Sequence, residues 1–399
     1  MPKLLISGLG CCLLDRIYDH VDFRSGAFCT YMSRTPGDGG LEPGKLTFEE
    51  ELEQFAGEPF TSQILPRLVG NRKPEKENIG GPCIVALINA SQLAWRESTV
   101  SFYGCRGDDD VAADLLQRLS QTSVDLTHYR TQQGSETPST SVLSDPDYDN
   151  GNGERTFVNV IGASWHYQPA EVDDSFYDSD ICVFGGTALV PRIHQSLSAM
   201  LERAKQRGAI TIVNTVYDSL SEKRTPGQRW PMGDGDRAYP FIDLLLVDHE
   251  EALRLSGCAD IPSSIAFFRE RGAHAVLVTN GARDVTLWAD SPLFGAVQEQ
   301  SLPVSAAVGK MLKEGRRGDS TGCGDNFAGG VIGSLARQMY ERRTATNATP
   351  QLDLLDATRW GIVSGGFACL YYGGTYLESH QGEKLSHLQD LYDQYLHQK

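Results

Sequence analysis

The chain has 399 residues, and 52 Asp and Glu against 36 Lys and Arg give a formal net charge of -16. Such an acidic surface repels nucleic acid and anionic membranes, so neither is expected as a partner. Hydrophobic residues make up 40% of the chain, enough to bury the core of one large domain or two ordinary ones.

Neither a metal cluster nor a targeting segment is expected. The nine cysteines contain no CxxC pair and the nine histidines are scattered, which is unlike a zinc site. The apolar run at 4–14 is broken by Gly8 and Gly10 and ends at Asp15, so it does not read as a signal peptide. No other stretch approaches the roughly 20 apolar residues of a membrane span. We therefore expect a cytoplasmic protein with reduced thiols.

The first part of the chain combines a few regular elements with one long irregular segment. The segment 22–78 is rich in Gly, Pro and Glu and is interpreted as an insertion with turns and a helix at 48–55. The other elements are expected to be strands at 3–7 and 99–103 and helices at 83–95 and 111–119.

The second part begins with a hairpin and continues with alternating elements. Strands at 139–143 and 155–161 flank a turn-rich loop at 145–153. Beyond them we expect strands at 181–184, 211–214, 244–247 and 275–279, helices at 193–206, 250–255, 265–271 and 323–340, a polar loop at 341–350 and a polar C-terminal tail. The alternation predicts a parallel sheet covered on both faces, and the hairpin predicts a second, smaller sheet.

The segment 318–330, GDSTGCGDNFAGG, places glycines and a carboxylate at the start of a helix. Backbone N–H groups there lack partners within the helix and, with the helix dipole, form an anion site. Asp325 would lie beside the bound anion, although two negative charges repel each other. A catalytic role, in which Asp325 accepts a proton from an attacking hydroxyl group, would explain this position. The alternative is a glycine-rich helix cap with Asp325 as a first-turn acid. The segment is neither a Walker A loop nor a dinucleotide fingerprint.

This segment resembles the C-terminal signature of the ribokinase-like, or PfkB, family of sugar and nucleoside kinases. The resemblance implies that Asp325 is the general base. It also implies that Gly322, Cys323 and Gly324, with Cys323 in place of the usual alanine, form the anion hole for the γ-phosphate. A thiol at a helix N-terminus tends toward the thiolate, so Cys323 is also a candidate for inhibition by oxidation or alkylation.

Further matches follow the order of the family over most of the chain. On the substrate side, Asp15 resembles the aspartate that binds substrate hydroxyls, Gly80-Gly81 resembles the di-glycine before a helix, and Arg155 lies in the expected lid hairpin. The family's substrate asparagine is replaced by Val85, and Asn89 lies one helical turn further on, which puts ribose itself in doubt as the acceptor.

On the nucleotide side, the resemblance implies ATP as phosphate donor. The expected contacts are Thr279, Gly281, Asp319 and Thr321. Glu251 matches the glutamate that helps to hold Mg²⁺ through water, and Asp248 replaces the family's asparagine. A monovalent cation such as K⁺ is a further candidate, near Asp319 and the turn at 373–374.

The implied fold is a three-layer αβα ribokinase-like fold with a mainly parallel central sheet and a small β-sheet lid. Its core is expected at 1–15, 80–133 and 167–399, and its lid, which includes the long insertion, at 16–79 and 134–166. The lid strands of this family often pair between subunits, so a homodimer through the lid is one expectation.

The expected function is ATP-dependent phosphorylation of a hydroxyl on a small sugar-like substrate. A nucleoside kinase and a catalytically silent nucleotide- or sugar-binding protein of the same fold remain alternatives. An NAD-dependent Rossmann enzyme would need a complete glycine fingerprint with an acidic residue at the next strand end, and neither is found.

Overall fold

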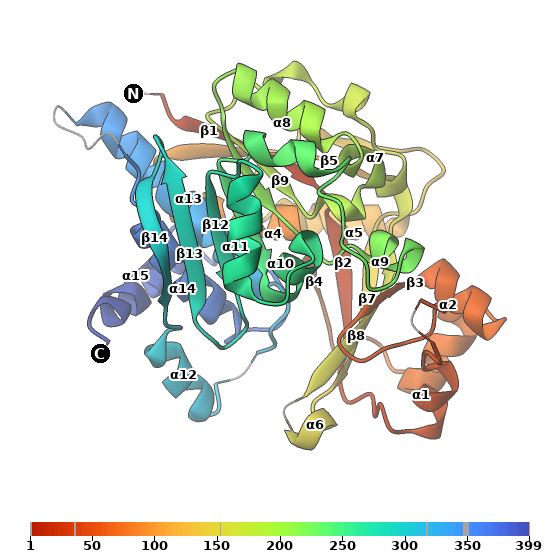
Figure 1. Ribbon diagram of the computed structural model, residues 1–399. Helices are drawn as coiled ribbons and strands as arrows, with labels where there is room; N and C mark the ends of the chain where they lie inside the picture. The colour runs from red at the N-terminus through yellow and green to blue at the C-terminus, as the bar shows by residue number, and fades with distance from the viewer. Residues whose placement is uncertain (1, 36, 152, 317, 346–350, 399) are drawn as a thin grey trace.

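The computed structural model describes residues 2–35, 37–151, 153–316, 318–345 and 351–398. A large sheet forms the centre, and a small sheet projects from it (Figure 1). The large sheet has the order β14-β13-β12-β11-β10-β9-β1-β5-β6. In that order its strands are Gly295–Leu302, Val285–Ser291, Ala275–Thr279, Leu244–Asp248, Ile210–Asn214, Ile181–Gly185, Leu4–Gly10, Ser98–Arg106 and Tyr129–Thr131.

The large sheet is parallel apart from β13, which runs antiparallel to both of its neighbours. Its central strands are apolar on both faces, because successive side chains point to opposite sides. In β9, Ile181 and Val183 join one buried cluster, while Cys182 and Phe184 join the other. The fold is therefore a three-layer αβα fold, as the alternation of strands and helices in the sequence predicts.

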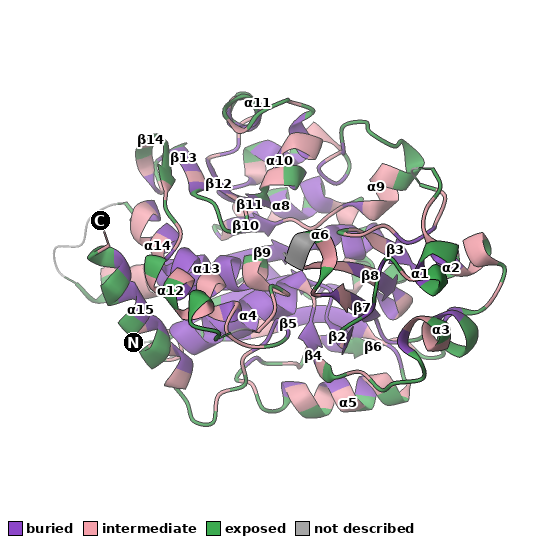
Figure 2. Cartoon of the chain, turned by 90° about the horizontal axis from the view of Figure 1, so that it is seen from below, coloured by how far each residue is buried: buried purple, intermediate pink, exposed green. Residues whose placement is uncertain are grey.

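Two groups of helices cover these two faces. One face packs against α4 (Pro82–Leu93), α5 (Asp110–Leu119), α12 (Ala306–Lys313), α13 (Cys323–Thr344), α14 (Leu354–Ala368) and α15 (Glu383–Leu396). The other packs against α7 (Pro191–His194), α8 (Leu197–Gln206), α10 (His249–Ser256) and α11 (Ile261–Glu270). Figure 2 shows α4 and the first half of α13 buried in the middle of the molecule.

The small sheet has the order β3-β8-β7-β2-β4, with strands Leu46–Phe48, Glu154–Val160, Ser139–Asp145, Leu13–Tyr18 and Lys76–Gly80. The predicted hairpin is present as β7 and β8, which pair from Ser139↔Val160 to Asp145↔Glu154. The chain passes from β1 to β2 through the buried pair Cys11-Cys12 and returns from β4 to α4 through Gly81. Both crossings are short, so this sheet lies directly beside the ends of the central strands.

The predicted insertion folds into short helices that pack on the outward face of the small sheet. They are α1 (Gly26–Tyr31), α2 (Glu49–Ala56) and α3 (Leu65–Val69), with a π-helical turn η1 at Phe60–Ile64 before α3. Phe28, Leu52 and Phe60 form a separate buried cluster with Leu143 of β7 and Val158 of β8. That face of the small sheet is therefore buried within the chain itself.

Several elements differ from the prediction. The helix expected at 193–206 is divided into α7 and α8 at Gln195-Ser196, and the loop at 145–153 contains the short helix α6 (Tyr148–Gly151). The loop expected at 341–350 starts later, because α13 continues to Thr344, and 346–350 lie outside the described residues. The hairpin of β13 and β14 and the helices α12 and α14 had not been assigned. The polar C-terminal tail, for which a helix was one interpretation, contains the helix α15. The remaining short elements are α9 (Ser219–Arg224), η2 (Gly162–Trp165), η3 (Pro169–Glu171), η4 (Asp174–Phe176), η5 (Thr187–Leu189) and η6 (Asp236–Phe241).

Within the described residues, no helix combines the length and the apolar character that crossing a membrane requires.

Candidate active site

A cavity of about 390 Å³ lies where the small sheet faces the ends of the central strands and the start of α13. Most of the predicted site residues share this cavity. Its walls include Asp15, Gly81, Arg155, Asp248, Glu251, Thr279, Thr321, Gly322, Gly324 and Asp325. Gly80, Gly281, Asp319 and Cys323 are not among its lining residues. The cavity thus brings together segments that are more than 300 positions apart in the sequence.

The start of α13 has the backbone geometry of an anion site. Gly322 is the N-cap residue and has a φ of 72°, a conformation that glycine adopts without strain. A Cβ atom on Gly322 would lie 2.5 Å from the Cα atom of Gly374, so no side chain fits there. The position of a Cβ atom on Gly324 is open space. The N–H group of Cys323 donates to the carbonyl oxygen of Ser320 at 3.3 Å. The N–H groups that follow it in this first turn lack partners within the helix, so they can bind an anion in the cavity.

Asp325 stands in the first turn of α13, and the part of it that is exposed lines the cavity. Protein atoms around the carboxyl replace water and raise its pKa from 3.8 to about 6. The Asn214 side chain acts in the opposite direction and lowers this pKa, but its effect is smaller than that of burial. A carboxyl with such a pKa is mostly ionised at neutral pH and can still accept a proton.

Asp15 reaches the cavity from β2 and is almost completely buried. Burial, with the negative charges of Asp319 and Asp325, raises its pKa to about 8, while Thr140 and Arg155 act in the opposite direction. Gly80 makes room for this side chain, because a Cβ atom on Gly80 would lie 2.1 Å from Asp15 Oδ2. The structure therefore gives the two residues different parts. Asp15 lines the cavity, and Gly80 leaves room for the Asp15 side chain.

Arg155 connects the small sheet to the turn before α13. Its Nη1 donates to Thr321 Oγ1 at 2.9 Å, and its Nη2 donates to the hydroxyl of Ser320. Among the described residues it forms no ion pair with a carboxylate. The Arg155 guanidinium is therefore a positive charge beside the predicted anion site, bonded to two hydroxyl groups and lying 5.9 Å from the centroid of the Phe157 ring.

Asp248 and Glu251 begin α10, next to the end of β11. They form a capping box in which Asp248 Oδ1 accepts the N–H of Glu251 and Glu251 Oε2 accepts the N–H of Asp248. Glu251 is buried, it also accepts from the Thr215 hydroxyl, and burial raises its pKa to about 8. No group of three or more metal-ligating side chains occurs in the described part of the chain. Any Mg²⁺ held here would need further oxygen ligands, which the phosphates of a nucleotide supply in such sites.

The remaining nucleotide-side residues have different surroundings. Thr279, at the end of β12, lines the cavity next to Asp248 in the neighbouring strand. Gly281 is exposed and has a φ of 56°. Asp319 Oδ1 accepts the N–H of Thr321 at 2.6 Å, and Oδ2 accepts the N–H of Gly373 at 3.0 Å. Asp319 therefore joins the turn before α13 to the turn at 373–374, where the monovalent cation was expected.

Cys323 faces away from the cavity and toward a second thiol. Its Sγ lies 3.2 Å from Sγ of Cys369, at the end of α14. The hydrogen bond to Cys369 and burial raise the pKa of Cys323 well above its usual value of 9.0, and the same bond lowers the pKa of Cys369. These contacts favour the neutral thiol at Cys323, as for a small residue in place of alanine, and inhibition by oxidation or alkylation stays a prediction.

Sequence reasoning missed several residues of the cavity wall. Lys45 and Leu46 come from the insertion, and nothing in its composition pointed to them. Asn159 had a usable signal, because it follows Arg155 by four positions in β8 and side chains at even spacing share one face of a strand. Tyr217 follows β10 and also lines the cavity.

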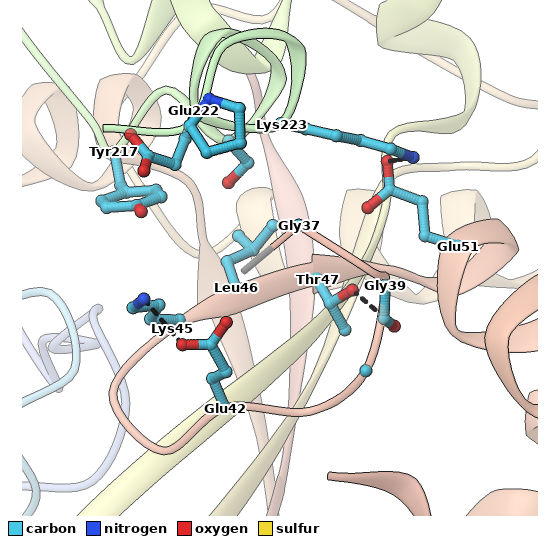
Figure 3. Close-up of a pocket in the computed structure, with 13 residues that line it drawn as sticks. Gly37, Gly39, Glu42, Lys45, Leu46, Thr47, Glu51, Tyr217, Glu222 and Lys223 are labelled. Carbon is cyan, nitrogen blue, oxygen red and sulfur yellow. Dashed lines mark hydrogen bonds and ion pairs between the residues drawn. The ribbon is translucent and has the colours of Figure 1, made fainter. Parts of the chain in front are cut away.

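A smaller cavity of about 70 Å³ lies beside the first one, between the insertion and α9 (Figure 3). Lys45, Leu46 and Tyr217 line both cavities. Across the smaller one, Lys223 Nζ of α9 pairs with Glu51 Oε1 of α2 at 2.6 Å. The insertion therefore contacts the segment that follows β10, at the side of the main cavity.

A third cavity, of about 520 Å³, contains Trp165 and His166. Trp165 is not packed in the core, because 46% of its surface is exposed. Phe48 and Leu220 line the same cavity.

Comparison with known proteins identifies the fold and the family. The model of the pfkB family carbohydrate kinases matches residues 61–380. The chain belongs to the PfkB family. A fructokinase of Klebsiella pneumoniae is 26% identical over 242 residues, which are 59% of this chain and 70% of that protein. The chain is therefore a carbohydrate or nucleoside kinase.

Solved structures of PfkB-type kinases share the whole fold. The adenosine kinase of Schistosoma mansoni in complex with 2-fluoroadenosine has a TM-score of 0.68 at 15% identity, with 93% of this chain and 96% of that chain covered. An E. coli ribokinase II in complex with ATP and Mg²⁺ has a TM-score of 0.62 at 15% identity, with 98% and 99% covered. The predicted ribokinase-like fold is thereby confirmed.

Proposed function

We propose that this kinase transfers the γ-phosphate of ATP to a hydroxyl group of a small sugar-like substrate, with Asp325 as general base. The observation that carries this proposal is the position of Asp325 in one cavity with Asp15, Arg155 and the open first turn of α13. A base, a group that binds hydroxyls, a positive charge and an anion site are the parts that phosphoryl transfer requires.

In the proposed reaction, Asp15 and the backbone at Gly81 orient the acceptor. Its hydroxyl oxygen attacks the γ-phosphorus in line while Asp325 takes the hydroxyl proton. A new P–O bond forms as the bond between the γ-phosphorus and the leaving oxygen of ADP breaks. The N–H groups of Gly322, Cys323 and Gly324 balance the charge on the transferred group.

The nucleotide is proposed to lie along the Thr279 side of the cavity, with Thr321 near its phosphates and with Gly281 and Asp319 as supports. Mg²⁺ would be held by the phosphates together with Glu251, through water, and Asp248. It would neutralise phosphate charge during transfer. The structure of an E. coli ribokinase II with ATP and Mg²⁺ supports this arrangement by analogy. A monovalent cation near Asp319 remains a prediction.

The acceptor is proposed to be a sugar, and a nucleoside is the second candidate. The fructokinase relative favours the sugar, and the adenosine kinase neighbour shows that a nucleoside is accommodated on this fold. In this chain Val85 is buried and does not line the cavity, while Asn89 donates its amide to the backbone carbonyl of Asn326. Asn89 is therefore engaged within the core, and binding of the sugar hydroxyls is left to Asp15 and Asn159.

The homodimer through the lid also remains a prediction. The outward face of the small sheet is buried against α1, α2 and α3, so a second copy would have to contact the outer surface of the insertion.

The test is release of ADP from Mg-ATP in the presence of single sugars, sugar acids and nucleosides. Asp325→Asn, which keeps the size of the side chain and removes the base, should lower kcat by about 10²- to 10⁴-fold while the affinity for ATP is largely kept. Turnover limited to one class of acceptor would identify that class. Near-normal turnover of Asp325→Asn would refute the assignment of the base, and nucleotide binding without any transfer would favour the silent binding protein.

A further inference from the structure

Lys384 is a buried cation that the proposed reaction does not use. It lies in the first turn of α15 and is 1% exposed. Removing an ammonium group from water is costly, and the dipole of a helix disfavours positive charge at its N-terminus. Within the described residues, no Asp or Glu oxygen lies within ion-pair distance of its Nζ atom. Burial lowers the pKa of Lys384 to about 7, although the charge of Glu378 raises it. The free-energy cost of burying this ammonium group indicates that Lys384 has a function.

The contacts of the ammonium group lead directly to α13. Lys384 Nζ donates to Oδ1 of Asn326 at 2.8 Å, and Asn326 is completely buried next to Asp325. The hydroxyl group of Tyr371 donates to the same Oδ1 at 3.2 Å. Because an ammonium group is only a donor, Lys384 requires the oxygen, not the nitrogen, of the Asn326 amide to face it.

This orientation of the amide determines what its nitrogen holds. Asn326 Nδ2 donates to the carbonyl oxygen of Gly322 at 2.9 Å and to that of Gly374 at 2.7 Å. Gly322 is the left-handed N-cap residue of α13, and Gly374 is the residue against which it packs. One amide thus joins the turn of the anion site to the C-terminal turn, and a reversed amide would place oxygen against both carbonyl groups.

We propose that Lys384 is a positioning residue for phosphoryl transfer, acting through Asn326. The ammonium group fixes the Asn326 amide, the amide holds the carbonyl groups of Gly322 and Gly374, and the N–H groups of the first turn of α13 then point into the cavity. This inference rests on the proposed function, because the anion that those N–H groups would bind is the γ-phosphate.

The experiment compares binding of Mg-ADP and of Mg-AMP-PNP, a non-hydrolysable ATP analogue, by titration calorimetry. Only AMP-PNP places a γ-phosphate in the anion site, so the ratio of the two affinities reports on that site. Lys384→Met removes the donor and nearly keeps the length of the side chain. We expect the ADP affinity to remain and the preference for AMP-PNP to fall by on the order of tenfold, the effect of losing one charged hydrogen bond. In the transfer assay, kcat should fall while KM for the acceptor is unchanged.

Thermal stability separates positioning from a general structural role. Replacing a buried cation by an apolar side chain is often neutral or stabilising, so Lys384→Met should melt at the wild-type temperature or above. Lys384→Gln keeps an N–H donor without the charge and should restore the preference for AMP-PNP. Lys310→Met is the matched control, because Lys310 is an exposed lysine of α12 whose side chain is 79% exposed.

Each outcome supports or overturns the inference. An unchanged AMP-PNP preference in Lys384→Met would overturn it. A parallel loss of both affinities and of melting temperature would also overturn it, by reducing Lys384 to a structural residue. If Lys384→Met does not fold, Lys384→Leu, which also removes the donor to Asn326 Oδ1, is measured in its place, and an unchanged preference in that variant would overturn the inference. Failure of the wild type to bind either nucleotide would instead refute the proposed function, and this inference with it.

Discussion

Single residues of the cavity differ in how far the sequence predicts them. Asp325 could be predicted, because a carboxylate between glycines at the start of a helix has few structural explanations. Lys45 and Asn326 could not be assigned, because their roles depend on contacts with segments distant in sequence. The contact of Cys323 with Cys369 could not be predicted for the same reason, since Cys369 lies 46 positions away in the chain.

The pKa of Asp325 leads to a prediction about the pH dependence of kcat/KM. A general base must be deprotonated, so kcat/KM should fall as pH decreases through about 6, the pKa that burial gives to this carboxyl. Asn214 lowers that pKa, so Asn214→Ala should raise it and move the acid limb to higher pH. The measurement is kcat/KM against pH for both proteins. An acid limb at the same pH in both would show that another group sets it, and Asn89→Ala, which changes an amide outside the cavity, serves as the control.

The secondary-structure elements were predicted best where the hydrophobic pattern is periodic. The parallel strands and their helices follow the alternation of the sequence, whereas β14 was missed because most of its residues are exposed on the edge of the sheet. α15 was interpreted as a polar tail with a helix as one possibility, and Leu388, Leu391, Tyr392 and Tyr395 form a buried stripe at helical spacing. Part of the glycine signature also serves packing, since a Cβ atom on Gly329 would lie 2.4 Å from the carbonyl oxygen of Ala86 in α4.

The strand β8 leads to a prediction about the lid. Arg155 reaches from β8 to the hydroxyl groups of Ser320 and Thr321 without a carboxylate partner, so its charge is available to the transferred phosphate. We expect Arg155→Met to lower kcat by roughly 10²-fold, as for the loss of one donor to a transition-state charge. Arg130→Met, in the edge strand β6, should not change kcat, since Arg130 pairs with Asp173 at the surface. Equal activities of the two variants would exclude Arg155 from the reaction.

At the scale of the whole molecule, the buried carboxyl group of Asp15 makes the free energy of unfolding depend on pH. The pKa of Asp15 is raised to about 8 in the folded chain, mainly by burial. The unfolded chain loses this proton near the ordinary value of 3.8, so between about pH 4 and pH 8 the folded state binds more protons. The free energy of unfolding therefore decreases as pH rises through this window.

A comparison with Asp15→Asn isolates this effect, because the variant cannot ionise at that position. Below about pH 4 both side chains are neutral in the folded and in the unfolded chain, and the two melting temperatures should be similar. At about pH 9 the wild type carries a buried charge, so the variant should melt several degrees higher. Thermal melts of both nucleotide-free proteins across this range are the measurement. A constant difference in melting temperature at all pH values would contradict the raised pKa.

The insertion of residues 22–78 gives the outward face of the lid its own cover, built from Phe28, Leu52 and Phe60 against Leu143 and Val158. The apolar surface of the lid is therefore satisfied by residues that are synthesised with it and cannot dissociate from it. A second copy of the chain is therefore not needed to cover this face. The burial of these side chains is then expected to be independent of protein concentration.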